Sequence, residues 1–151
     1  LYNSRYKGSD GIERNTSFNG GYAINILGGR EFKLNEKSTL SLGAKVTLAG
    51  GKRFGTLDSL ASSFEKEVIY LDEGFNEQQF EDYFRADFKL SYKYNAKKVT
   101  HEFSLDIVNL LGTKNILNLT YAPVPGDPEA DAIRKNYQLG FLPIFFYRLD
   151  F

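Results

Sequence analysis

The chain has 151 residues, of which 15 % are aromatic, and it contains 13 Phe, 10 Tyr and 14 Gly but no Trp, Cys or Met. Lys plus Arg equals Asp plus Glu at 19 each, so no basic footprint indicates nucleic-acid binding. No apolar run approaches the roughly 18 residues of a membrane-spanning helix, which excludes a helical mode of insertion for these residues. The absence of Cys fits, weakly, an oxidising compartment in which no disulfides form.

The first third of the chain alternates between apolar and polar residues, which is the period of a strand. The N-terminus lacks the pattern of a signal peptide, and Leu1–Lys7 reads as a strand already under way, so we expect the chain to start mid-domain. After a polar loop at Gly8–Asn15, the pattern predicts strands at about Ser17–Gly28 and at Ser38–Ala49, joined by a short connection at Glu31–Lys37.

The longest irregular region is Gly50–Asp82, and loops of such length are usually functional or mobile. Within it, apolar residues at a spacing of four predict a short helix in Asp58–Tyr70, with Asp58 or Ser59 as its N-cap.

The clearest strand is Tyr83–Tyr94, followed by a tight polar turn at Asn95–Lys98 and a strand that rises from Thr100. Alternation puts large apolar residues on one face of these strands, and we expect that face to contact lipid. The aromatic residues expected to face lipid include two from the terminal strand: Phe84, Phe88, Tyr92, Tyr94, Phe141 and Phe145. The opposite face carries charges of both signs, which we expect to line a lumen as a salt-bridged inner wall: Arg85, Asp87, Lys89, Glu102 and Asp106.

The last third of the chain breaks the pattern once, at Asn109–Asn115, where we expect a bulge or twist before alternation resumes at Leu117–Tyr121. A loop rich in Pro, Gly and Asp at Pro123–Lys135 precedes a terminal strand over Tyr137–Phe151. Because Pro143 cannot donate to the ladder, we expect a bulge or local unpairing there.

Two architectures produce such alternation: a soluble β-sandwich and a membrane β-barrel. The predicted strands exceed the usual length of about 5–6 residues and suffice for a tilted crossing of about 9–11. Short and long connections alternate along the chain, as periplasmic turns and extracellular loops do in barrels, and aromatic residues lie near both ends of one apolar face. The sequence therefore predicts an all-β fold, an antiparallel transmembrane β-barrel segment of about five to six strands.

Strand parity then places the C-terminus on the periplasmic side, with Gly50–Asp82 and Pro123–Lys135 outside the cell. Single-chain bacterial barrels need about 8 strands, and an open sheet in lipid leaves backbone groups unpaired at several kcal/mol each. We therefore expect residues 1–151 to be the C-terminal part of a larger barrel whose earlier strands lie outside this chain.

Several stretches resemble the late strands of TonB-dependent outer-membrane receptors of the Bacteroidetes type. They follow the family's order over nearly the whole chain: Tyr6–Gly11, Arg14–Thr16, Phe18–Gly20, Leu27–Phe32, Ala49–Phe54, Asp82–Asp87, Thr100–Asn109, Tyr137–Pro143 and Tyr147–Phe151. The resemblance implies a barrel of about 22 strands in the outer membrane, closed by a plug domain. It also implies nutrient import energised through TonB, which a segment N-terminal to this chain would engage, and it does not identify the substrate.

The last residues also resemble the assembly signal of outer-membrane proteins, a glycine followed by alternating apolar residues and a final aromatic: Gly140, Tyr147, Leu149 and Phe151. The resemblance implies recognition by the barrel-assembly machinery, and strand addition to an exposed edge is the physical mode that would serve it. The aromatic residues would also contact outer-membrane lipid. Leu142, Ile144 and Phe146 make the second face of this strand apolar too, and we expect them to pack against the plug.

Other candidate sites are weaker. His101, the only histidine, is expected to have a structural or solvent-exposed role. Asp127, Glu129 and Asp131 alternate as carboxylates in a calcium loop do, but Ala132 stands where an EF-hand needs glycine, so a solvated acidic loop is expected. The sequence shows no nucleophile–base set, phosphate loop or thiol cluster, and we predict no catalytic residue, no metal and no cofactor.

The leading hypothesis is therefore import through a gated outer-membrane receptor. The alternative has no active transport: a structural or adhesive barrel, or a barrel subunit of a larger surface complex. A soluble β-sandwich is the third possibility. A plug domain and a TonB-engaging segment upstream of Leu1 would support import.

Overall fold

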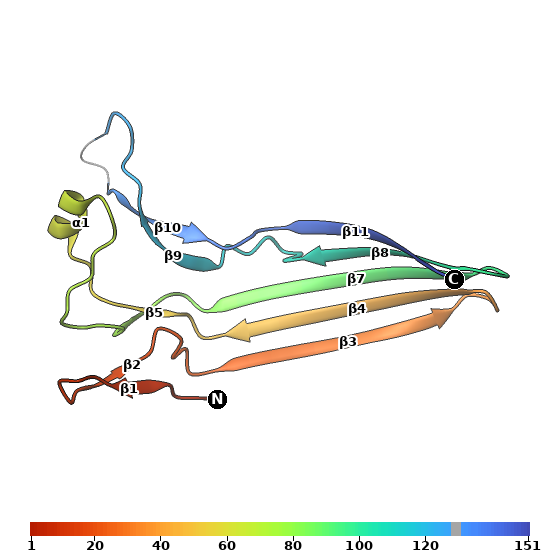
Figure 1. Ribbon diagram of the computed structural model, residues 1–151, viewed down its shortest axis with the longest axis horizontal. Coiled ribbons are helices and arrows are strands. Elements are labelled where there is room, and N and C mark those ends of the chain that lie inside the picture. The colour runs from red at the N-terminus through yellow and green to blue at the C-terminus, as the bar shows by residue number, and fades with distance from the viewer. Residues whose placement is uncertain (128–130) are drawn as a thin grey trace. The chain divides into compact units, whose positions relative to one another are not determined.

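The computed structural model describes residues 1–127 and 131–151, and these residues form an all-β, antiparallel structure with one short helix. They divide into two compact units. We call the first the loop unit (residues 1–23, 49–83 and 114–138) and the second the strand unit (residues 24–48, 84–113 and 139–151) (Figure 1). The prediction of an antiparallel all-β fold is confirmed.

No helix among the described residues has the length and apolar character to cross a membrane.

The strand unit is built on one five-stranded sheet with the order β11-β8-β7-β4-β3. Its strands are the long arrows in Figure 1: β3 (Ala23–Lys33), β4 (Ser38–Ala49), β7 (Tyr83–Asn95), β8 (Thr100–Val108) and β11 (Leu142–Asp150). β3 with β4 and β7 with β8 form two hairpins, and β4 lies beside β7. Alternation along each strand therefore becomes two distinct faces of one sheet.

Two hairpin turns lie at one end of this sheet, which we call the turn end. In the β3–β4 turn the amide of Leu34 donates to the carbonyl of Ser38 (2.9 Å), and in the β7–β8 turn Ala96 donates to Val99 (2.8 Å). The two turns are neighbours, because the amide of Asn95 donates to the carbonyl of Lys37 at 2.7 Å. The end of β11 lies there too, since Asp150 pairs with Thr100 (Figure 1). The predicted strand Ser38–Ala49 and the predicted tight turn at Asn95–Lys98 are confirmed.

The loop unit contains three short antiparallel pairs: β1 (Arg5–Lys7) with β2 (Glu13–Asn15), β5 (Arg53–Phe54) with β6 (Gln78–Gln79), and β9 (Ile116–Tyr121) with β10 (Ile133–Tyr137). Its helix, α1, spans Ser59–Glu65. The Asp58 carboxylate accepts from the amide of Ala61 at 2.9 Å and caps this helix, so the predicted helix and its N-cap are confirmed.

Polar side chains hold the loop unit together. The buried Asn19 accepts from the amide of Ser4 (2.9 Å) and donates to the side chains of Asn3 and Asn15 (both 2.8 Å). The buried Asn76 donates to the carbonyl of Asn15 at 2.8 Å. Each amide satisfies groups of a distant segment, which fixes loops that have few ladder hydrogen bonds.

The strand predicted at Ser17–Gly28 is misplaced, because β3 spans Ala23–Lys33. The residues before β3 form turns instead. The backbone amide of Asn19 donates to the carbonyl of Thr16 (3.0 Å), and Gly21 has φ +82. The strand also continues past Gly28, and the connection to β4 is shorter than the predicted Glu31–Lys37.

The predicted continuous terminal strand is also wrong, because it is two strands. β10 ends at Tyr137 and pairs with β9 in the loop unit, whereas β11 begins at Leu142 and pairs with β8 in the strand unit. The expected bulge at Pro143 is absent: Pro143 pairs with Ile107 in unbroken register, and the register shift lies at Asn136/Tyr137. In the described sheet β11 is an edge strand, where a residue without an N–H is tolerated.

The segment Asn109–Asn115 is a connection that leaves one sheet after β8 and enters another at β9. The bulge or twist expected there within one strand is therefore wrong. Asn109 is fully buried with φ +53, a left-handed conformation that Asn tolerates. Its amide donates to Asp87 (3.0 Å), and its side chain donates to the carbonyl of Thr113 (2.9 Å) and accepts from that residue's amide (3.0 Å). The predicted loop Pro123–Lys135 ends sooner than expected, because β10 starts at Ile133.

Burial in this chain is the reverse of that in an ordinary globular domain. Among the described residues Ile116, 8 % exposed, is the one large apolar side chain that is buried. The other buried side chains are polar: Asn19, Ser38, Ser62, Asn76, Ser91, Ser104, Asn109 and Asn115. Soluble domains bury Ile, Val, Leu and Phe first, so the described residues lack a conventional hydrophobic core.

Candidate functional site: the two faces of the sheet

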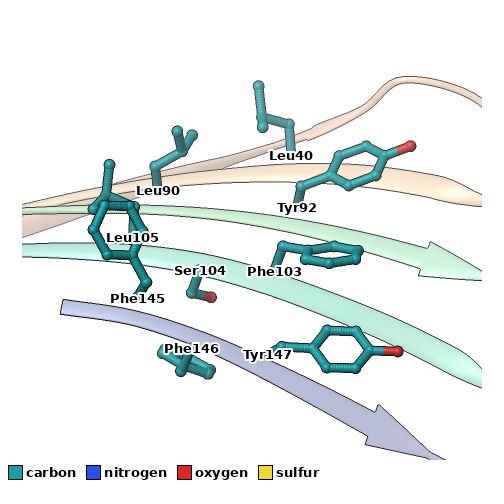
Figure 2. A pocket seen from close by; sticks show the side chains of 9 residues that line it. All are labelled: Leu40, Leu90, Tyr92, Phe103, Ser104, Leu105, Phe145, Phe146 and Tyr147. Carbon is teal, nitrogen blue, oxygen red and sulfur yellow. The ribbon is translucent and has the colours of Figure 1, made fainter.

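The register of β7, β8 and β11 fixes which side chains share a face. Tyr92 pairs with Phe103, which pairs with Tyr147 on its other side. Two residues further along, Leu90, Leu105 and Phe145 form a second row on the same face. We call this the apolar face; Figure 2 shows the rings of Tyr92, Phe103 and Tyr147 in sequence across three strands.

The apolar face is exposed although its residues are large. Phe145 is 75 % exposed, and Phe103 and Tyr147 are each 53 % exposed. The rings of Phe103 and Tyr147 lie 4.8 Å apart, and with Leu40 of β4 and the second row they border a shallow hollow of about 470 Å³ (Figure 2). Large contiguous apolar surfaces of this kind mark contact with another protein or with lipid.

The opposite face, which we call the polar face, is joined by pairs between neighbouring strands. Lys89 Nζ lies 3.2 Å from Asp106 Oδ2, and Arg148 lies 3.5 Å from Glu102 Oε2. Between these ion pairs, the buried hydroxyls of Ser91 and Ser104 share a 2.6 Å hydrogen bond. Like the Lys89–Asp106 pair, this bond joins residues directly opposite one another in the ladder, the geometry in which cross-strand pairs stabilise a sheet.

A second hollow, of about 480 Å³, lies on the polar face, where Gly29 and Gly43 of neighbouring strands leave space above the sheet. Asp87, Lys89 and Asp106 also border it. Within the part of the chain that the structure describes, Asp106 Oδ1 is buried without a hydrogen-bond partner. The same residues contain no group of three potential metal ligands, so the chemistry available here is hydrogen bonding and ion pairing.

Five of the six aromatic residues expected to face lipid lie within the strands of the sheet. Phe84, Phe88, Tyr92 and Tyr94 alternate along β7, and Phe145 lies on β11 in the row of Leu105. The sixth, Phe141, is 55 % exposed and lies in the connection before β11.

The charged residues expected on the other face form three ion pairs. Two have been described: Lys89 with Asp106, and Glu102 with Arg148. In the third, Arg85 lies 3.0 Å from Asp87.

The terminal residues lie at both ends of β11. Gly140 precedes the strand in open space, Tyr147 and Leu149 lie two residues apart on the apolar face, and Phe151 is 98 % exposed after the strand ends. His101 Nδ1 and Tyr147 Oη are 2.7 Å apart, so the histidine belongs to this aromatic cluster.

Three features escaped the sequence analysis. The Ser91–Ser104 pair was missed because serine on a charged face reads as a solvated residue. Arg148 was not included among the charged residues, although it contacts both Glu102 and Asp150 (3.0 Å). Phe146 was expected on the second face of the terminal strand, but its contact was not: Lys89 Nζ lies 5.0 Å from its ring centroid.

In the loop unit, hydrogen bonds between nearby ionisable side chains shift the pKa values of Asp10 and Tyr22. The Arg14 guanidinium donates to Asp10 (2.6 Å), and this bond, with the amide of Ile12, lowers the pKa of Asp10 to about 2. The Tyr22 hydroxyl donates to Asp82 at 2.6 Å, which raises the pKa of Tyr22.

The acidic loop expected at residues 127–131 is described only at its margins. Asp131 accepts from the amide of Ile133 at 2.9 Å, whereas Glu129 lies outside the described residues.

Comparison of the chain with protein-family models, with curated proteins and with solved structures yields no match. The functional argument therefore depends on the residues themselves.

Proposed function

We propose that this chain is the C-terminal part of the barrel of a TonB-dependent outer-membrane receptor, which imports a nutrient across the outer membrane. In this proposal the five-stranded sheet is a section of a barrel of about 22 strands, with its apolar face in lipid and its polar face towards the lumen. The remaining strands, the plug and the TonB-engaging segment belong to parts of the protein outside this chain.

One observation carries the proposal: the described residues bury polar side chains and expose large apolar ones. Ser91 and Ser104 are each 6 % exposed on the polar face, whereas Phe145 on the apolar face is 75 % exposed. Water disfavours this distribution, because each exposed large side chain forgoes about 1.5–3 kcal/mol of burial. A lipid bilayer favours this distribution, because the strands of a membrane barrel turn their apolar side chains outward to the lipid and their polar side chains inward.

The lengths of the strands support the same proposal. β3, β4 and β7 have 11, 12 and 13 residues, and a tilted membrane-crossing strand needs about 9–11. The choice of receptor family depends on the resemblance of the sequence stretches quoted above, which follow the order of that family. Import energised through TonB is what this resemblance implies. A C-terminus at the periplasmic side, read by the assembly machinery through Gly140, Tyr147, Leu149 and Phe151, completes the proposal.

Membrane orientation can be tested with adjacent residues, because the chain contains no Trp. Phe145→Trp places an indole on the apolar face and Phe146→Trp places one on the polar face. In the intact protein, with every tryptophan outside this chain replaced by phenylalanine and the protein reconstituted in vesicles that contain brominated phospholipid, we expect strong quenching of fluorescence for the first variant and weak quenching for the second. Equal quenching of both variants would overturn the proposal.

Transport needs a separate test, because a structural or adhesive barrel would give the same quenching. We expect site-specific crosslinking in cells to join the N-terminal region of the intact protein to TonB. An intact protein that lacks a plug domain and forms no TonB adduct would instead be the structural or adhesive barrel.

A further inference from the structure

The neutral chain is made of two oppositely charged units. The loop unit has 13 acidic and 9 basic side chains, and the strand unit has 10 basic and 6 acidic ones. The excess of positive charge in the strand unit is concentrated at the turn end, which holds five lysines: Lys33, Lys37, Lys93, Lys97 and Lys98.

These lysines are exposed and uncompensated. Within the described residues none of the five belongs to an ion pair. Two of the three acidic side chains at this end, Glu102 and Asp150, are already paired with Arg148. Glu36 remains at this end, and Glu31 lies on β3 two residues before Lys33. Five lysines against these two carboxylates still leave a local excess of positive charge.

An aromatic band borders this charge on the apolar face. The rings of Tyr94 and His101 stack with centroids 6.3 Å apart, and those of His101 and Tyr147 stack at 6.1 Å. Rings with an apolar body and a polar edge prefer the boundary between hydrocarbon and headgroups.

Arg30 is a cation on the apolar face itself. The side chain of Glu31 contacts Ser41 at 3.4 Å on the polar face, so the preceding residue points to the other side of β3. The Arg30 guanidinium lies 5.1 Å from the ring centroid of Phe32, two residues nearer the turn end. A long cationic side chain that leans from an apolar surface towards a polar boundary is snorkelling.

We propose that the turn end binds the anionic headgroups of a phospholipid surface, with Lys37, Lys97, Lys98 and Arg30 as its phosphate contacts. The inference rests on the proposed function, because it needs the apolar face to lie in lipid. The aromatic band sets the depth of the sheet, and the cations then lie at the level of the phosphates. Basic residues next to a membrane each add about 1 kcal/mol of attraction to anionic lipid.

The test compares two variants with the same change in charge. Lys97→Gln/Lys98→Gln removes two turn lysines, and Lys7→Gln/Lys66→Gln removes two exposed lysines of the loop unit. The detergent-purified intact protein is mixed with vesicles of phosphatidylcholine alone or of phosphatidylcholine with phosphatidylglycerol, and its partition into each is measured.

We expect phosphatidylglycerol to increase the partition of the unaltered protein, and the turn variant to lose about fivefold of this gain per lysine. The loop variant should retain the gain, and salt should reduce it because the attraction falls off within a Debye length of about 8–10 Å. Arg30→Gln should lose part of the gain as well.

Three outcomes would overturn the inference. If the unaltered protein and the turn variant partition equally into both kinds of vesicle, the proposed headgroup contact is wrong, whereas the proposed function stands. Equal losses in the turn and loop variants would assign the effect to net charge. Failure of the unaltered protein to enter either vesicle would overturn the inference together with the proposed function.

Discussion

The strand unit and the loop unit use the same residue types in opposite ways. In the strand unit, alternation sorts side chains onto two faces, and position in the strand decides whether a residue is apolar or charged. In the loop unit, individual amides such as Asn19 and Asn76 join segments far apart in the sequence. The first unit is therefore specified by a period and the second by particular contacts, and a single substitution should harm the second more.

The largest effect is expected in the loop unit, where two backbones touch. A Cβ on Gly50 would overlap the carbonyl oxygen of Gly20, so Gly50→Ala forces two segments apart. Backbone cannot yield as a flexible side chain can, and we expect a loss of about 3 kcal/mol in the free energy of unfolding. A urea titration of the purified protein measures this loss.

Gly28→Ala in β3 is the matched control, because a Cβ there meets no atom within 4 Å. We expect it to change stability by no more than about 1 kcal/mol, in either direction. A Gly50→Ala protein as stable as the control would show that the two loop segments do not approach so closely.

An intermediate effect is expected at the one buried polar pair of the β7–β8 ladder. Ser104→Ala removes one hydroxyl and leaves Ser91 buried without its partner, at a cost of about 1–3 kcal/mol. Removing both hydroxyls should cost less than the sum of the single changes, because neither group is then left unpaired. Urea titrations of the four proteins give the coupling energy, and strictly additive losses would contradict the hydrogen bond.

The strand unit was largely predictable because period and turn chemistry are local. The alternation of β7 predicts which of its side chains lie on each face. The turn at Asn95–Lys98 fixes the register of β7 with β8, and this register places Lys89 opposite Asp106. The break before β11 was not predictable in this way, because apolar residues continue at every second position across Gln138–Phe141. At this break the side chain of the buried Asn109 donates to the carbonyl of Leu139 at 3.3 Å, a contact between residues 30 apart that no local pattern indicates.

The loop unit was predictable only where its signals are short-range. Asp58 before an apolar run indicated the helix and its cap. The bond from Asn76 to the carbonyl of Asn15 spans 61 residues, and no local pattern indicates which distant carbonyl an asparagine will find.

The smallest effect is expected on the surface of the loop unit, in the pH dependence of Asp10. Its carboxylate is held by Arg14, and the pKa of Asp10 falls from 3.8 to about 2. A lowered folded-state pKa means that the stabilisation is complete above the unfolded value of 3.8 and is lost as the pH falls through about 2.

Carbon-13 NMR of the Asp10 carboxyl group, titrated between about pH 5 and pH 1, measures this midpoint directly. Arg14→Gln should move the midpoint back towards 3.8, whereas Arg5→Gln should leave it unchanged, because Arg5 pairs with Glu13 at 3.8 Å. The effect on stability should be small because both side chains are solvent-accessible and exposed ion pairs contribute little. A midpoint near 3.8 in the unaltered protein would contradict the Asp10–Arg14 pair, because a carboxyl group that titrates alike in the folded and unfolded chain adds no stability.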